Sequence, residues 1–171
     1  MSLGKTPLVT AVLAVIAALI IGGCGSDGSG GGYGSGGEST QAASTGSSGA
    51  SVAVVSVASV PKLGPVLVDS KGFTLYDFHK DKGGKSACYG ACAGVWPPLT
   101  TDGAPQRKDG AMASKLGTVK REDGTMQVTY AGHPLYTYAA DTKPGDAKGN
   151  DFSSYGAEWY ALQPSGEEAE G

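Results

Sequence analysis

Two cysteines and two histidines are the residues of this chain whose types could carry metal or redox chemistry. Cys88 and Cys92 stand in the stretch SACYGACAG, with His79 shortly before them and His133 much later, in a turn signal. Two thiolates and two imidazoles form a ligand set that zinc or copper accepts. One hypothesis is therefore a metal or redox centre, with Met126 as a further soft ligand.

The same cysteines also suit a disulfide. The third cysteine of the chain, Cys24, lies near the N-terminus, so its modification would leave Cys88 and Cys92 as an even pair. Disulfides persist outside the cytoplasm, and the C-x-x-x-C spacing lacks the C-x-x-C and H-x-x-x-H pattern of zinc modules. The favoured prediction is a disulfide that fixes a local turn or short helix just before Trp96.

Arrangements of catalytic residues are scarce. Most serines lie in a Gly/Ser-rich stretch, where no scaffold orients a nucleophile or an oxyanion hole. The chain has no G-x-S-x-G elbow, no H-E-x-x-H motif and no phosphate-binding glycine loop that leads into a helix. Asp81 and Asp141 remain general-base candidates. We name no catalytic residue and no cofactor; a non-enzymatic protein is favoured, and enzymatic activity stays an open question.

Two polar loops could bind ions or anions. The first, HKDKGGKSACYG, is basic and could meet an anionic wall polymer or a lipid headgroup. The second, DTKPGDAKGND, spaces Asp141, Asp146 and Asp151 five residues apart, but it lacks the calcium-binding spacing of an EF-hand. For both loops, ordinary solvated charge is the simpler explanation.

An internal duplication relates these residues to one another. TLYDFHKD (74–81) is nearly repeated as PLYTYAAD (134–141), and VWPPLTTDG (95–103) as EWYALQPSG (158–166). We place repeat one at about residues 65–103 and repeat two at about 125–166. The matched positions are Tyr76 and Tyr136, Phe78 and Tyr138, Asp81 and Asp141, and Trp96 and Trp159.

The alternation inside each motif predicts a strand. Residues two apart share a face of a strand, so Tyr76 and Phe78 point one way while Leu75 and Asp77 point the other. The motif aspartates fall just past the strand ends, where a carboxylate can fix a loop. The structural interpretation is core packing with a capped loop. The alternative is a pair of related grooves, each with an aromatic wall and one carboxylate, that hold a sugar, a peptide or a small aromatic molecule.

Strand signals also occur at 52–60, which is rich in β-branched residues, and at 125–130, after a turn signal. Helical periodicity is absent except around 87–94. The sequence therefore predicts a mostly β fold: one small antiparallel domain at 51–164, built from two repeats with pseudo-twofold symmetry. A short helix or turn is expected at the cysteine pair. The oligomeric state is left open.

The N-terminal residues predict export. Lys5 precedes an apolar run at 8–21, which is shorter than the roughly 20 residues of a membrane-spanning helix. The run ends in Ile-Gly-Gly-Cys24, which resembles the lipobox of bacterial lipoproteins. That resemblance implies a signal peptide at 1–23 and a diacylglyceryl group on Cys24, with acyl chains that hold the protein to the membrane. The alternative is an ordinary signal peptide with a chance cysteine.

Two further segments look flexible. Residues 25–50 are dominated by Gly and Ser and predict a disordered tether behind the lipidated Cys24. Residues 165–171, SGEEAEG, predict a flexible acidic tail. The chain has a formal net charge of −3. The sequence shows no cluster of basic residues of the kind that nucleic-acid-binding proteins use.

The paired Y-x-[FWY]-x-x-D motifs, YDFHKD and YTYAAD, resemble those of the bacterial "secreted repeat" lipoproteins, over about residues 64–162. The resemblance implies an extracytoplasmic, lipid-anchored protein of the cell envelope, and it fixes the class rather than the activity. We expect a non-enzymatic binding or structural module of unknown ligand. The alternative is an envelope redox or metal-handling protein that uses Cys88, Cys92 and His79. The second loop has no cysteines, which argues against a ligand shared symmetrically by both copies.

Overall fold

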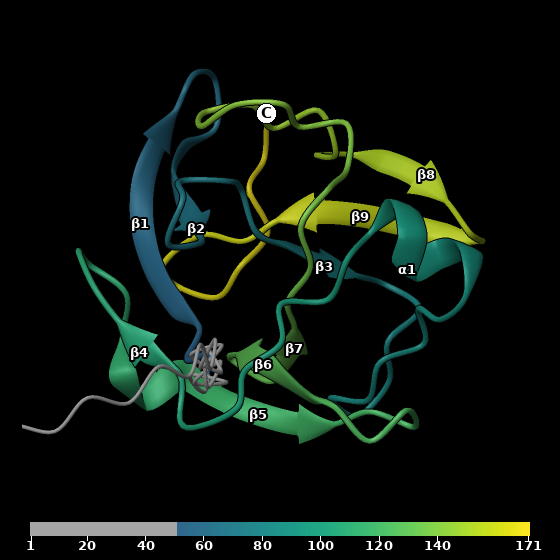
Figure 1. Cartoon of the computed structure of the whole chain (residues 1–171). Helices are drawn as coiled ribbons and strands as arrows, with labels where there is room; N and C mark the ends of the chain where they lie inside the picture. The colour runs from purple at the N-terminus through teal and green to yellow at the C-terminus, as the bar shows by residue number, and fades with distance from the viewer. Residues whose placement is uncertain (1–50) are drawn as a thin grey trace, which may run out of the picture. The chain divides into compact units, whose positions relative to one another are not determined.

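The computed structural model describes residues 51–171, which form the mostly β fold that the sequence predicts (Figure 1). The signal peptide, Cys24 and the tether lie outside the described residues. Three small sheets have the strand orders β2-β1-β4, β3-β9-β8 and β5-β6-β7, and every pairing is antiparallel except the short β1–β4 pair. The elements are β1 (Val54–Val60), β2 (Gly64–Val68), β3 (Tyr76–Phe78), α1 (Ala91–Val95), β4 (Gln106–Arg107), a 3-10 turn (Ala113–Lys115), β5 (Leu116–Lys120), β6 (Met126–Tyr130), β7 (His133–Pro134), β8 (Phe152–Ser154) and β9 (Ala157–Ala161).

Each half of the domain begins with a hairpin, β1–β2 in the first and β5–β6 in the second. Strand β1 is rich in valine, and β6 contains valine, threonine and tyrosine, all of which suit a pleated and partly buried surface. A glycine turn follows each hairpin, with Gly72 at φ 85° and Gly132 at φ 89°, a conformation that glycine adopts without steric cost. The hairpins show that the repeats start one strand before the expected boundaries at 65 and 125.

The two Tyr motifs meet each other at a local twofold relation. The backbone N–H of Tyr76 donates to the carbonyl of Tyr136 at 2.9 Å, and the N–H of Tyr136 donates back to the carbonyl of Tyr76 at 2.9 Å. A reciprocal pair of this kind is the antiparallel bridge in which two residues exchange both of their bonds. The pseudo-twofold symmetry expected from the sequence is therefore centred on the two motif tyrosines.

The Trp-Leu segments are exchanged between the repeats. Leu162 of repeat two donates its N–H to the carbonyl of Leu75 at 3.2 Å and accepts from the N–H of Leu67 at 2.7 Å, both in repeat one. Leu99 of repeat one does the same in repeat two, with Leu135 at 2.9 Å and Val128 at 2.8 Å. Each repeat thus completes the hydrogen bonding of the other, and the two halves interlock.

Two apolar clusters form the core, one on each face of the motif strands. Tyr76 and Phe78 lie in an aromatic cluster with both tryptophans, whereas Leu75 lies in an aliphatic cluster with Leu67 and other residues. The alternation that the motif predicts is confirmed. Within residues 51–171, no helix is long and apolar enough to span a membrane.

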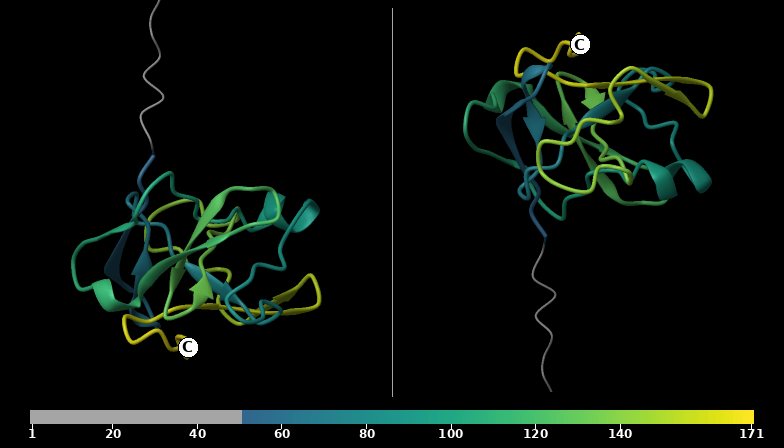
Figure 2. Two further views of the ribbon diagram at one scale, coloured as in Figure 1. Left: turned by 90° about the horizontal axis from the view of Figure 1, so that it is seen from below. Right: turned by 90° about the horizontal axis from the view of Figure 1, so that it is seen from above.

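The C-terminal segment is folded, which corrects the expectation of a flexible tail at 165–171. Ala169 is only 1% exposed, and its N–H donates to the carbonyl of Ala161 in β9 at 2.7 Å. Leu162 and Glu168 form a further antiparallel bridge. The charged composition of the segment suggested a flexible tail. Its backbone N–H and C=O groups instead form hydrogen bonds with the neighbouring strand, which holds the segment in place. The segment lies at the end of the domain opposite to the start of β1 (Figure 2).

Candidate functional site

The aromatic residues of both motifs form one continuous stack through the core. Phe78 stacks on Trp159 at a centroid distance of 3.9 Å, Trp159 on Trp96 at 3.9 Å, and Trp96 on Tyr138 at 4.1 Å. Tyr76 and Tyr136 meet the stack edge-on, at 5.4 Å from Trp96 and 5.2 Å from Trp159. The tryptophan of each repeat therefore stacks on the motif of the other repeat, as the strand exchange requires.

The motif tyrosines and aspartates are also paired across the repeats. The hydroxyl of Tyr76 donates to Asp141 at 2.6 Å, and the hydroxyl of Tyr136 donates to Asp81 at 2.8 Å. Each carboxylate also accepts a backbone N–H from its own loop, Asp81 from Ala87 at 2.7 Å and Asp141 from Lys148 at 2.9 Å. Tyrosine and aspartate recur in both copies because each aspartate fixes its own loop and also holds the other repeat.

Burial controls the protonation of these groups. Desolvation raises the pKa of Asp81 to about 6, although the Ala87 N–H and the Tyr136 hydroxyl both favour the charged carboxylate. Burial also raises the pKa of Asp141. Burial, with the nearby Asp141 in the case of Tyr76, keeps the pKa of both motif tyrosines well above the ordinary value. Both hydroxyls are thus neutral donors.

The motif residues do not form a pair of open grooves, which were the alternative to the favoured structural interpretation. Tyr76, Tyr136 and both tryptophans are fully buried, and Phe78 and Asp141 nearly so. Asp81 and Tyr138 are partly buried. Tyr138 stacks on Trp96 of the other repeat, and Asp81 is bonded to Tyr136 of the other repeat and to Ala87 of its own loop. An aromatic wall beside a free carboxylate would need space in front of both groups. Here the rings contact one another and the carboxylates are hydrogen bonded, so the motif serves the core.

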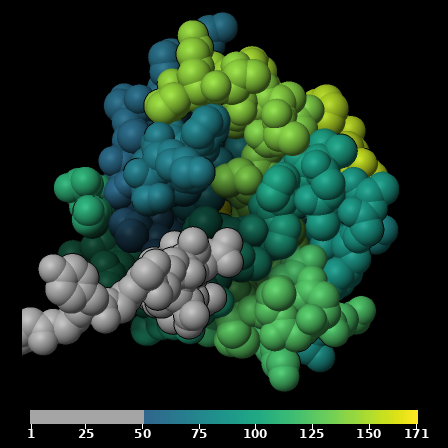
Figure 3. All heavy atoms as spheres, in the orientation of Figure 1, coloured from purple at the N-terminus to yellow at the C-terminus, as the bar shows by residue number. Residues whose placement is uncertain are grey.

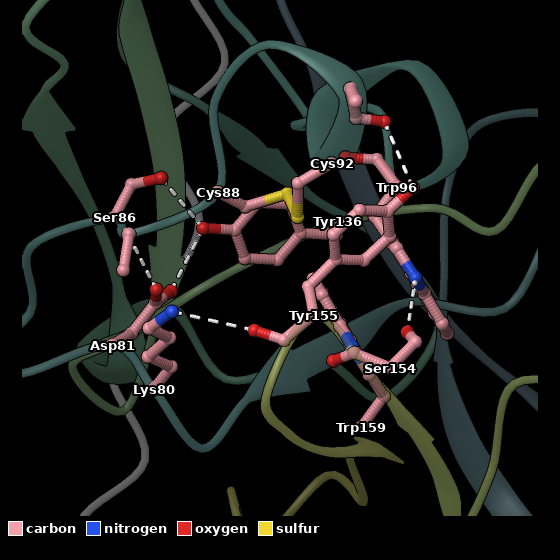
Figure 4. Close-up of a disulfide and its surroundings, with 12 residues drawn as sticks. Lys80, Asp81, Ser86, Cys88, Cys92, Trp96, Tyr136, Ser154, Tyr155 and Trp159 are labelled. Atoms are coloured by element: carbon pink, nitrogen blue, oxygen red, sulfur yellow. Dashed lines mark hydrogen bonds between the residues drawn. A yellow bond between two sulfur atoms is a disulfide. The ribbon is translucent and has the colours of Figure 1, made fainter.

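Cys88 and Cys92 form the predicted disulfide, and α1 is the predicted short helix beside it (Figure 4). Both cysteines are buried, 0% and 6% exposed. The proposed ligand set of two sulfurs with His79 and His133 is not assembled, because the sulfurs are bonded to each other.

Arg121 fixes the cysteine loop from the β5–β6 turn. It is 3% exposed and donates to the carbonyl of Cys88 at 2.7 Å, to Ser86 Oγ at 2.6 Å and to Gln127 Oε1 at 2.7 Å. Ser86 Oγ in turn lies 2.7 Å from the hydroxyl of Tyr136. Sequence reasoning missed Arg121, because an arginine beside the turn signal Glu-Asp-Gly looks like a solvated charge.

Several charged side chains of the two polar loops form hydrogen bonds or ion pairs with other residues of the chain. Asp146 accepts from the backbone N–H of Thr142 at 3.0 Å and pairs with Lys148 at 3.0 Å, and Asp151 accepts from the hydroxyl of Tyr160 at 3.1 Å. With Asp141 bound to Tyr76, the three aspartates serve different partners. In the part of the chain that the structure describes, they do not form a group that could hold a metal ion. In the first loop, Lys82 donates to the carbonyl of His79 at 3.3 Å.

Both histidines of the chain line one cavity of about 370 Å³, together with Asp77 and Glu168. His133 Nδ1 lies 3.0 Å from Asp77 Oδ2, and His79 Nε2 lies 2.6 Å from Glu168 Oε1. The hydrogen bond with Asp77 raises the pKa of His133, against the effect of burial. Imidazole and carboxylate are metal ligands, and the ligand atoms of Asp77, His79 and Glu168 lie within 4.8 Å of one another, so these three residues could hold an ion. Sequence reasoning missed Asp77 and Glu168, although Asp77 and His79 share a strand face by alternation.

Comparison with known proteins identifies the repeats. A family described as "secreted repeat of unknown function" matches residues 57–100 and 117–163, which together make up more than half of the chain. Both matches begin inside the first hairpin strand of a repeat and end at its Trp-Leu segment. No curated protein and no solved structure matches the chain. The matches imply an extracytoplasmic location, and the chain belongs to this family of secreted repeats of unknown function.

Proposed function

We propose that the protein is a lipid-anchored component of a bacterial cell envelope whose folded domain is a non-enzymatic binding module. The observation that carries the anchor is the position of Cys24, directly after Ile-Gly-Gly at the end of an apolar run. Several acyl chains on one cysteine hold a protein to a membrane far better than a single chain does. Membership in a secreted family agrees with this placement.

The chemistry of the motif supports binding over catalysis. The side chains that both repeats share are hydrogen bonded to each other or stacked, and the shared tyrosine hydroxyls are neutral. A general base needs a free lone pair within reach of its substrate. The motif carboxylates instead accept bonds from both repeats, which is the arrangement of a structural pair.

The disulfide supports the same proposal over a redox function. Thiol–disulfide exchange requires a thiolate to reach a sulfur atom, and both cysteines are buried within the loop that Arg121 fixes. A ligand would instead meet the cavity lined by His79 and His133, where polar groups converge at the surface.

The anchor is tested by Cys24→Ser in the full chain expressed in a bacterial host, with Ser26→Ala as the control two residues away. We expect wild type and the control in the membrane fraction, with an N-terminal peptide whose mass includes a diacylglyceryl group. Cys24→Ser should leave the membrane fraction and lose the lipid mass. An unmodified Cys24 in the wild-type peptide would refute the anchor.

A further inference from the structure

We infer that Asp77, His79, Glu168 and His133 form a binding site for one divalent transition-metal ion, of the kind that Zn²⁺ and Cu²⁺ represent. The inference rests on the proposed binding function and names the class of ligand. Asp77 and His79 come from the end of β3, His133 from β7 and Glu168 from the C-terminal segment. Both histidines of the chain are thus used in one place.

The spacing of the donor atoms fits one ion. One ligand atom each from Asp77, His79 and Glu168 lies within 4.8 Å of the other two. Zinc binds nitrogen and oxygen at about 2.0–2.2 Å, which puts neighbouring ligands of a tetrahedral ion about 3.4 Å apart. His79 and Glu168 are only partly buried, so small side-chain rotations can complete the approach.

Asp77 supplies an independent observation. It is 2% exposed and lines the cavity, yet its Oδ1 atom has no hydrogen-bond partner among residues 51–171, whereas Oδ2 is paired with His133. A buried carboxylate oxygen without a partner is costly, and native proteins rarely leave one unsatisfied. A bound cation would satisfy this atom. His133 would then either join the ion or hold Asp77 from the other side, as partners of metal ligands do.

The donor set indicates the class of ion. Two imidazoles and two carboxylates suit zinc and copper, whereas calcium and magnesium prefer sites made of oxygen alone. Among divalent ions, a mixed nitrogen and oxygen site binds copper and zinc more tightly than manganese or iron(II).

The site breaks the symmetry of the scaffold. By the matching of Tyr76 with Tyr136, Asp77 corresponds to Thr137, His79 to Ala139 and His133 to Phe73. The second repeat therefore contributes Tyr136 to the tyrosine bridge with Thr137 and Ala139 in place of Asp77 and His79, and the first repeat has Phe73 in place of His133. The shared core does not require them, which separates the cluster from the structural motif.

The position of the site suits a tethered protein. Glu168 belongs to the segment at the end of the domain opposite to the start of β1 (Figure 2). The segment that supplies Glu168 to the site thus lies away from the start of β1, where the chain enters the domain.

The test is calorimetric titration of the full chain, in detergent and freed of metal with a chelator, with ZnCl₂. We expect one ion per chain, no binding in His79→Ala or Glu168→Gln, and binding weakened about 10- to 100-fold in His133→Ala. The matched control is Glu167→Gln, since Glu167 is exposed and bonded to Ser165; it should bind as wild type does. Excess CaCl₂ should not displace the zinc.

A second variant keeps the test independent of folding. Asp77→Thr with His79→Ala installs the residues of the second repeat at matched strand positions. It should keep the near-ultraviolet circular dichroism of the tryptophan stack, bind no zinc, and lose the rise in melting temperature that zinc gives wild type. Equal zinc binding by this variant and wild type, or no binding by wild type, would overturn the site. Neither outcome affects the lipid test at Cys24, so the two proposals fail separately.

Discussion

At the scale of single residues, the motif works through crossed pairs rather than through an exposed surface. Tyr76 binds Asp141 and Tyr136 binds Asp81, so the aspartate of each copy is partly buried by the other copy. A carboxylate removed from water favours its neutral form. The motif should therefore leave a signature in the pH dependence of stability.

Asp81→Asn tests this signature. The pKa of Asp81 is about 6 in the folded protein, against about 3.9 for an unfolded chain. The folded state thus binds the proton more tightly, and the contribution of Asp81 to stability is complete below pH 4 and lost as pH rises to about 6. We expect the free energy of unfolding of wild type, minus that of Asp81→Asn, to fall between pH 4 and 6. Urea unfolding across this range measures it.

Asp123→Asn is the control. Bonds from Thr125 lower the pKa of Asp123, so its contribution is lost only as pH falls below about 4. The difference in the free energy of unfolding between wild type and Asp123→Asn should stay constant between pH 4 and 6, the range in which the difference for Asp81→Asn changes. A flat difference for Asp81→Asn as well would mean that Asp81 is ionised throughout, and that burial does not govern the pair.

At the scale of elements, the second polar loop covers the aromatic stack. Gly149 is buried, and its N–H points to the hydroxyl of Tyr76 at 3.4 Å. A Cβ atom at Gly149 would lie 2.6 Å from the ring of Trp96 and 3.1 Å from that of Tyr76. The loop around residues 140–150 lies across the upper part of the face in Figure 3. Its glycine permits this close approach to the rings.

Gly149→Ala should therefore destabilise the domain by about 1–3 kcal/mol, the usual cost of overpacking a core. Gly94→Ala is the matched control, because Gly94 is exposed in α1 and an added Cβ meets nothing within 4 Å. Replacing that glycine should leave stability unchanged or raise it by up to about 1 kcal/mol. Thermal unfolding of both variants measures this difference. Equal stability of the two variants would show that the loop is not closely packed against the aromatic stack.

At the scale of the whole molecule, the exchange of Trp-Leu segments makes the two repeats one folding unit. Leu162 completes repeat one and Leu99 completes repeat two. Neither repeat alone can pair these strands, and each contributes only one of the two stacked tryptophans. Contacts so distant in sequence form only when both halves are present.

A split chain tests this interdependence. Fragments 51–109 and 110–171 separate the repeats at an exposed turn. We expect neither fragment to fold alone, and an equimolar mixture to recover the near-ultraviolet circular dichroism of the stacked Trp96 and Trp159. A single fragment that folds as a monomer would contradict the exchange. The same fragments mixed in urea give the unfolded baseline.

The sequence by itself determined the local features of this protein. Two copies of one motif predicted the duplication, alternation predicted which side chains share a face, and the C-x-x-x-C spacing predicted the disulfide. These features depend on residues close together in the chain, where the geometry of a strand or a short loop leaves few options. The family assignment follows from the same duplicated motif.

Only the tertiary structure decided which residues meet. It crossed the Tyr–Asp pairs, exchanged the Trp-Leu segments, buried Arg121 beneath the cysteine loop and folded the acidic C-terminal segment. It also brought His79, His133, Asp77 and Glu168 to one cavity. Alternation gives the face of a side chain but not its partner, because strand partners are chosen by long-range register and by the burial of both faces at once.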